Sequence, residues 1–179
     1  HTFFLKYIWS QDHKVIAIQY SIVAIFVGLV ALVLSGLMRL QLGFPDQFHF
    51  VDPNQYYQFI TMHGMIMVIY LLTALFLGGF GNYLIPLMCG ARDMVFPYMN
   101  MLSFWVYFLA VIVLLSSFFV PGGPTGAGWT LYPPLVLQSG QAFPMAIFAI
   151  HLMGASSIMG AINVIVTVVN MRAPGMTLH

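Results

Sequence analysis

The sequence predicts an all-α integral membrane protein with four transmembrane helices and both termini on the cytoplasmic side. Of its 179 residues, 61% are hydrophobic and only 5% are charged, whereas soluble domains carry about a quarter charged residues. The mean hydropathy is +0.94. The five basic and four acidic residues leave three long uncharged runs, at 15–38, 53–91 and 94–171. So few charges also argue against disorder and against nucleic-acid binding.

Each uncharged run is long enough for a membrane-spanning helix, which needs about 20 apolar residues. The first run predicts one helix, and the second predicts one long helix because it contains no strong turn before its far end. The third run is interrupted between Pro121 and Pro134 by prolines and glycines that cannot continue a helix, so it predicts two. The predicted helices lie over about 15–42, 56–88, 100–120 and 142–171.

The basic residues predict the orientation of these helices. With four spans, the N-terminus, the loop around Arg92 and the C-terminal tail share one side, which carries Lys6, Lys14, Arg92 and Arg172. The other side has one basic residue, Arg39. Since cytoplasmic loops are enriched in Lys and Arg, both termini are expected in the cytoplasm or its topological equivalent.

Two histidines lie within predicted helices, where an ionisable side chain is costly and suggests a function. His63 is about seven residues from the outer end of the second helix, and a neutral imidazole is a common ligand of haem iron. The alternative is a hydrogen bond from His63 to a neighbouring carbonyl. His151 lies about nine residues inside the fourth helix, so a haem bridging the two histidines is also conceivable.

Other polar residues allow two interpretations each. Arg39, at the outer end of the first helix, either extends to the membrane surface or reaches a polar group on a buried cofactor. Asp93, beside Arg92 in an inner loop, is either one half of a solvated pair or an acid that collects protons. A further set of uncharged residues either holds a file of waters or joins the helices. These residues are Asn82, Asn100, Ser156, Ser157 and Asn163.

Several longer motifs follow one another along the chain. They include Asp12-His13-Lys14, Met38-Arg39, Thr61-Met62-His63-Gly64, Gly78-Gly79-Phe80-Gly81-Asn82-Tyr83, Gly90-Ala91-Arg92-Asp93, Leu131-Tyr132-Pro133-Pro134 and Gly160-Ala161-Ile162-Asn163. In this order they resemble the N-terminal part of subunit I of the haem–copper terminal oxidases, the cytochrome c oxidase family. The resemblance runs from about Trp9 to the end, and it implies helices one to four of about twelve.

The resemblance assigns roles to individual residues. It implies that His63 is an axial iron ligand of the low-spin haem, with haem a the expected type, and that the other ligand lies on a later helix. It makes Arg39 a contact of that haem's periphery, Asp93 the acid at the mouth of a proton pathway, and His151 a packing or hydrogen-bonding residue. The other pathway residues that it implies are His13 near the mouth and Tyr20, Asn82, Asn100, Ser156, Ser157 and Asn163 along a water chain.

The activity implied by the resemblance is electron transfer from cytochrome c through the low-spin haem to oxygen reduction, coupled to proton pumping. The second haem and the copper are expected to be held by later helices, so this chain alone is not expected to reduce oxygen. The expected partners are the remaining helices of subunit I, other oxidase subunits, cytochrome c and the lipid bilayer, with no nucleic acid. A bacterial plasma membrane is expected in preference to the mitochondrial inner membrane.

Departures from the family pattern bear on the electron donor. Arg92 is shared with quinol oxidases of the same superfamily, which leaves a quinol oxidase as an alternative. However, Val30, Leu34 and Gln55 stand where the quinol oxidases have the quinone-binding Arg, Asp and His, and only Gln58 matches. A quinone headgroup needs such polar partners, so cytochrome c is the expected donor.

Two alternatives of other classes stay open at this stage. One is a b-type membrane cytochrome that binds a single haem between His63 and His151 and has no oxidase activity. The other is a structural membrane subunit without redox function, which would keep the fold-specifying motifs and bind nothing. An optical spectrum distinguishes these two alternatives from an oxidase.

Overall fold

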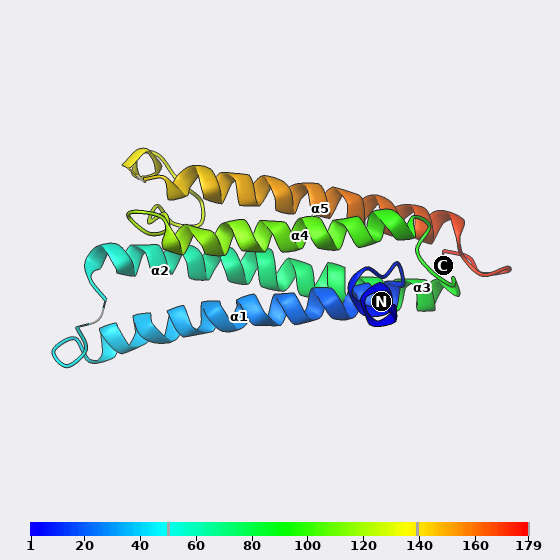
Figure 1. The fold of residues 1–179 in the computed structure, drawn as a ribbon, viewed down its shortest axis with the longest axis horizontal. Helices are drawn as coiled ribbons and strands as arrows, with labels where there is room; N and C mark the ends of the chain where they lie inside the picture. Colours follow the sequence, from blue (N-terminus) through cyan, green and yellow to red (C-terminus); the bar gives the residue numbers. More distant parts are fainter. Residues whose placement is uncertain (50, 139, 179) are drawn as a thin grey trace.

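The computed structural model describes residues 1–49, 51–138 and 140–178 and consists of long helices that run side by side (Figure 1). In this part of the chain four helices are long and apolar enough to cross a membrane, which confirms the predicted number of spans. The helices are α1 (His13–Gly43), then α2 (Pro53–Met65), η2 (Ile66–Gly81) and α3 (Asn82–Cys89) in one continuous span, followed by α4 (Pro97–Ser116) and α5 (Ala142–Asn170). Short helical turns are η1 (Phe4–Ile8), η3 (Ser117–Phe119) and η4 (Leu135–Gln138).

Local sequence signals explain where the second span begins and ends. The Asp52 carboxylate accepts the backbone N–H of Gln55 at 2.8 Å, while the Gln55 side chain accepts the backbone N–H of Asp52 at 3.3 Å. This reciprocal capping box, with Pro53 at the first helical position, starts the helix three residues before the predicted residue 56. The span ends at Gly90, whose φ of +73° is a left-handed conformation that glycine adopts without steric cost.

The middle of the second span differs from the uniform α-helix that the sequence predicts. Over η2 the backbone is wound more widely, as a π-helix, and the Thr73 hydroxyl donates to the carbonyl of Val68, five residues earlier, at 3.1 Å. Gly78, within η2, lies directly against the ring of Tyr20 from α1. A Cβ at position 78 would be only 2.5 Å from that ring, so glycine permits the close approach of the two helices.

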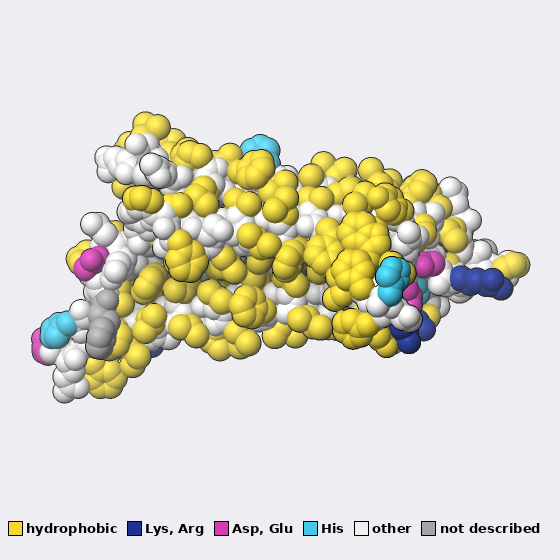
Figure 2. Space-filling model, in the orientation of Figure 1, with side chains coloured by type: hydrophobic (Ala, Val, Ile, Leu, Met, Phe, Trp, Pro, Cys, Tyr) yellow, Lys and Arg dark blue, Asp and Glu magenta, His cyan; other side chains and the backbone are white. Residues whose placement is uncertain are grey.

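The helices pack as two pairs, and α1, a member of one pair, also contacts the other pair. α4 packs mainly against α5, and α1 packs mainly against α2 and η2, while α1 also contacts α4. Tyr70 and Tyr107 are fully buried in the core between them, and the Tyr107 hydroxyl donates to the backbone carbonyl of Tyr70 at 2.7 Å. On the face drawn in Figure 2, hydrophobic side chains cover the length of the helices and charged side chains gather near the two ends. This distribution suits a protein whose middle section faces lipid or other apolar helices.

Both termini and the loop between α3 and α4 lie at one end of the molecule, which we call the terminal end (Figure 1). The α1–α2 and α4–α5 connections lie at the opposite end. The segment η1, which the sequence does not predict, is fastened to α1 at the terminal end, because the side-chain amide of Gln19 donates to the carbonyls of Tyr7 at 2.7 Å and Ile8 at 2.9 Å. Placement of the terminal end in the cytoplasm stays a prediction.

Candidate functional site

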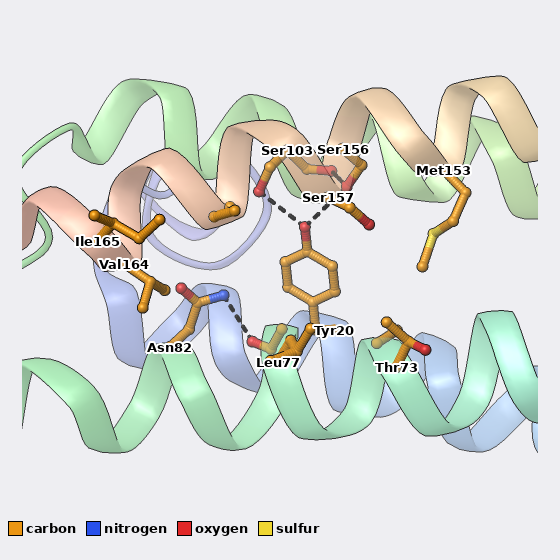
Figure 3. A pocket seen from close by; sticks show the side chains of 14 residues that line it. Tyr20, Thr73, Leu77, Asn82, Ser103, Met153, Ser156, Ser157, Val164 and Ile165 are labelled. Atoms are coloured by element: carbon orange, nitrogen blue, oxygen red, sulfur yellow. Dashed lines mark hydrogen bonds between the residues drawn. The ribbon is translucent and has the colours of Figure 1, made fainter.

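A cavity of about 230 Å³ lies among α1, the second span, α4 and α5, in the half of the molecule nearer the terminal end. Tyr20 crosses this space, with Asn82 on one side of it and Thr73 and Met153 on the other (Figure 3). Its polar wall is formed by Tyr20, Thr73, Asn82, Ser103, Ser156 and Ser157. The structure therefore brings Tyr20, Asn82, Ser156 and Ser157, four of the residues predicted for a water chain, to one cavity.

The hydroxyl groups in this cavity form a connected set. The Ser156 hydroxyl donates to the carbonyl of Ser103 at 2.6 Å, and the Ser103 hydroxyl donates to the carbonyl of Asn100 at 2.6 Å. Because both serine protons are used in this way, Tyr20 is the donor in its 2.8 Å contact with the Ser103 Oγ. The Tyr20 oxygen is also 3.3 Å from the Ser156 Oγ. All three oxygens keep lone pairs that can accept hydrogen bonds from water.

Asp93 lies half-buried in the loop between α3 and α4, at the terminal end. Its carboxylate accepts the backbone N–H of Met94 at 2.7 Å. Burial raises the pKa of Asp93 above its ordinary value, and the charge of Asp12 adds to this rise. The Met94 N–H, together with the charge and the backbone N–H of His13, partly opposes it. Asp93 is therefore an acid that holds its proton more readily than an exposed aspartate does.

His13 connects the surroundings of Asp93 to the cavity. The His13 side chain is 2% exposed, and its Nδ1–H donates to the backbone carbonyl of Asn82 at 2.8 Å. Asn82 lines the cavity and in turn donates from Nδ2 to the carbonyl of Gly78 at 2.7 Å. The half-buried Asp93 and the buried His13 and Asn82 thus follow one another from the terminal end toward Tyr20 and the serines.

Two further predicted pathway residues, both asparagines, have contrasting surroundings. Asn100 is fully buried, and neither atom of its side-chain amide has a hydrogen-bond partner among the described residues. An unpaired buried polar group costs about 1–3 kcal/mol, which a bound water offsets. Asn163 instead uses both amide atoms on the backbone of Phe96, accepting its N–H and donating to its carbonyl, each at 2.9 Å. Asn163 therefore fastens the start of α4 to α5, and its role in lining a water chain stays a prediction.

Sequence reasoning missed Ser103, which lines the cavity, and Thr167, which contacts Met94 and Val95 in the loop after Asp93. Ser103 stands at the centre of the hydroxyl set, although nothing in its local sequence indicates a polar function. The Thr167 hydroxyl accepts the backbone N–H of Val95 at 3.1 Å and donates to the carbonyl of Asn163 at 2.6 Å. Its spacing of four residues after Asn163 puts both on one helix face, which is the signal that could have found it.

His63 has a geometry that suits a metal ligand. It is half-buried in α2, and its Nδ1 lies 3.1 Å from the backbone carbonyl of Ala31 in α1. A carbonyl only accepts, so Nδ1 carries the proton and Nε2 keeps its lone pair. The hydrogen bond expected under the alternative interpretation is therefore present, and it leaves Nε2 available as a ligand.

The other residues considered for a cofactor lie elsewhere. His151 is exposed on α5, and its Nδ1 bonds to the carbonyl of Ile147 on the same helix at 2.8 Å. The His63 ring bonds to α1 and the His151 ring bonds to its own helix. Among the described residues, no hydrogen bond therefore joins the two histidines. Arg39 is exposed on α1, two turns beyond Ala31 toward the opposite end, and no described residue forms an ion pair or hydrogen bond with its guanidinium.

Comparison with known proteins identifies the family of this chain. A family model described as cytochrome C and quinol oxidase polypeptide I matches residues 15–179. The chain is 69% identical over 180 residues to the alternative cytochrome c oxidase subunit 1 of Bradyrhizobium diazoefficiens, with 97% of this chain and 30% of that protein covered.

Two proteins named cytochrome c oxidase subunit 1 are also similar to it. The one from Cereibacter sphaeroides is 40% identical over 208 residues, covering 99% of this chain and 37% of its own length. The one from Eremothecium gossypii is 44% identical over 178 residues, covering 97% and 33%. The chain thus spans about a third of the length of these relatives. These matches confirm the resemblance, and the chain belongs to the family of cytochrome c and quinol oxidase polypeptide I.

Proposed function

We propose that this chain is the N-terminal portion of subunit I of a terminal respiratory oxidase, helices one to four of about twelve. The complete enzyme passes electrons from cytochrome c through a low-spin haem to oxygen reduction and couples this reaction to proton pumping. This stretch supplies one haem ligand and the entrance of a proton pathway. The observation that supports the proposal most is the polar route from the half-buried Asp93 through the buried His13 and Asn82 to the hydroxyl-lined cavity.

The proton-conducting role follows from the cost of charge in hydrocarbon. A proton can cross this region only along hydrogen-bonded groups and water, because bare charge there is expensive. The raised pKa of Asp93 favours capture of a proton at the terminal end, which we place on the cytoplasmic side. Oxygens of Tyr20, Ser103 and Ser156 then accept hydrogen bonds from the waters that carry it. The buried side-chain amide of Asn100, which has no hydrogen-bond partner among the described residues, is a further place where such a water can bind.

His63 is the residue of this chain that fits a haem. Its Nδ1–H bond to the Ala31 carbonyl fixes the ring and leaves the unprotonated Nε2 as the atom that would hold the haem iron. When bound, the low-spin haem, of type a in this proposal, takes up and releases one electron at a time. Arg39 lies on the same helix as Ala31, and its guanidinium would supply a fixed positive charge that raises the potential of a haem held there. The second haem and the copper belong to the helices beyond this stretch.

Cytochrome c is the proposed electron donor. The three relatives compared above are all named cytochrome c oxidases. Gln58, the one residue shared with the quinone-binding set of quinol oxidases, donates its side-chain amide to the carbonyl of Gly122 at 2.7 Å and so ties α2 to a loop. Turnover of the complete enzyme with reduced cytochrome c but not with a short-chain quinol is the expected result. The reverse preference would identify a quinol oxidase.

The proposed location of the complete enzyme is a bacterial plasma membrane. The two bacterial relatives support this location.

The optical spectrum of the complete oxidase tests the haem assignment. We expect His63→Ala to remove the low-spin haem band, because the iron would lose one of its ligands. His151→Ala is the matched control, since that ring is exposed and bonds to its own helix, and the band should be retained. An unchanged band in His63→Ala would contradict the proposal. Loss of the band in both variants would support a haem bridging the two histidines.

A further inference from the structure

A second hollow, of about 460 Å³, lies on the outside of the molecule between η1, α1 and α4. We call it the interfacial groove. Its wall is apolar and includes Phe3 and Tyr7 from the N-terminal segment, Ile18 and Ile22 from α1, and Trp105 from α4. Figure 2 shows large hydrophobic side chains gathered over α4 beside the N-terminal segment. The volume is typical of sites that bury an organic ligand, which are about 300–1,000 Å³.

The groove is held in shape by contacts on two sides. The Gln19 amide bonds to the carbonyls of Tyr7 and Ile8 and so fixes η1 to α1. The ring of Trp9 stacks on that of Trp105, with centroids 6.1 Å apart, and fixes the same segment to α4. Without these contacts the exposed aromatic residues of the N-terminal segment would be free to move. The contacts therefore fix the shape of the groove.

The level of the groove along the helices suits the edge of a bilayer. Its α1 residues lie between Val15 and Val23, within about three turns of the start of that helix at His13. At this level acyl chains meet headgroups, and Trp and Tyr side chains are enriched there. An acyl chain that enters from the membrane would therefore follow α1 along the groove.

The rim of the groove carries a positive charge. The Lys6 ammonium lies 5.2 Å from the centroid of the Tyr7 ring, which is part of the wall. Lys6 is exposed, and no described residue forms an ion pair with it. The interfacial groove is apolar and has the Lys6 ammonium beside its wall. It is therefore complementary to a lipid that has an acyl chain and a negatively charged headgroup.

We propose that the interfacial groove binds an anionic phospholipid, with an acyl chain against Ile18 and Ile22 and the headgroup phosphate at Lys6. The proposal needs only that the helices cross a membrane. It is independent of the haem and proton-transfer roles proposed above. The competing occupant is protein, either a later helix of the same subunit or another subunit.

Photo-crosslinking separates these occupants in the complete oxidase. Ile22 is replaced by a diazirine-bearing amino acid, the cells or vesicles are irradiated, and adducts are identified by mass spectrometry. We expect phospholipid adducts enriched in anionic species over the composition of the membrane. Leu29 is the matched control, because it is exposed on α1 one and a half to two turns further along and does not line the groove. Peptide adducts, water adducts or lipid adducts of bulk composition at Ile22 would overturn the proposal.

The role of Lys6 is tested by lipid retention. The oxidase is reconstituted in vesicles of equal phosphatidylglycerol and phosphatidylcholine, and the lipids that remain bound are counted by native mass spectrometry. We expect Lys6→Gln to lower bound phosphatidylglycerol about fivefold, since one basic residue at the membrane surface is worth about that factor. Lys6→Arg should restore it. Equal retention in all three proteins would overturn the proposal, and the haem spectrum of each variant checks that the complex is assembled.

Discussion

At the scale of single residues, the candidate site relies on side chains that use one polar atom for the fold and keep another for chemistry. His63 donates from Nδ1 to Ala31 and keeps Nε2. The His13 ring is likewise fixed by its Nδ1–H bond to the Asn82 carbonyl. The hydroxyls of Ser103 and Ser156 donate to backbone carbonyls and keep their oxygens as acceptors. Each group is thereby fixed in direction without losing its function.

The protonation of Asp93 gives a prediction at this scale. Since burial is the largest influence and raises its pKa, the protonated fraction should fall as pH rises through a midpoint above 3.8, the value for an unperturbed aspartate. The measurement is the carbonyl stretch of the protonated carboxyl in infrared spectra of the complete oxidase, identified by its loss in Asp93→Asn. A midpoint at or below 3.8 would show that hydrogen bonds and the charge of His13 outweigh burial.

At the scale of elements, charge-free runs and Pro-Gly segments predict the four helices to within a few residues. The π-helical section η2 and the segment η1 could not be predicted, because neither has a local sequence signature. η2 packs against α1, and η1 is held to α1 by the hydrogen bonds of Gln19. Among site residues, His63 stands out because it is an ionisable residue deep inside a predicted membrane span. Asp93 is singled out by the family resemblance. The contact of Asn163 with Phe96 joins residues 67 positions apart, which no pattern in one sequence reveals.

The contact between α1 and η2 gives a prediction through Gly78. Gly78→Ala places a Cβ 2.5 Å from the Tyr20 ring, and such overpacking costs about 1–3 kcal/mol of stability. The thermal transition of the complete oxidase should therefore fall. Gly36→Ala is the control, because apart from its own helical turn no atom of the described residues lies within 4 Å of its added Cβ. Alanine also favours the helix, so the transition should hold or rise. An equal response of the two variants would contradict the close packing.

The two hydrogen bonds between Asn163 of α5 and Phe96 at the start of α4 give a second prediction at this scale. Asn163→Ala removes two hydrogen bonds to Phe96, each worth about 1 kcal/mol, so the Phe96 amide should exchange its hydrogen about tenfold faster or more. Hydrogen exchange of the peptide containing Phe96 measures this. Asn170→Ala changes an exposed residue of the same helix and should leave the exchange rate unaltered. A slow Phe96 amide in Asn163→Ala would mean that other contacts hold the loop.

At the scale of the whole molecule, this chain is a third of its relatives' length, and its exposed surface reflects that. Large hydrophobic side chains are exposed on every helix, for example Ile22 at 63%, Leu77 at 66% and Ile158 at 63%. Such surfaces are suited to contact with lipid or with further helices. The even number of spans brings both termini to one end, and the segments at this end carry four of the five basic residues. The side of the membrane that this end faces rests on the positive-inside rule.

The central claim is that protons enter the oxidase at Asp93, and the most direct test is Asp93→Asn in the complete enzyme reconstituted in vesicles. The substitution keeps size and hydrogen bonding and removes the charge. We expect turnover to fall about tenfold or more and pumping to be lost, with normal haem spectra, because proton uptake then limits the reaction. Asp46→Asn, the same change in the exposed α1–α2 connection, should leave all three unaltered. Wild-type turnover and proton stoichiometry in Asp93→Asn would contradict the account and leave Asp93 as a surface residue beside Arg92.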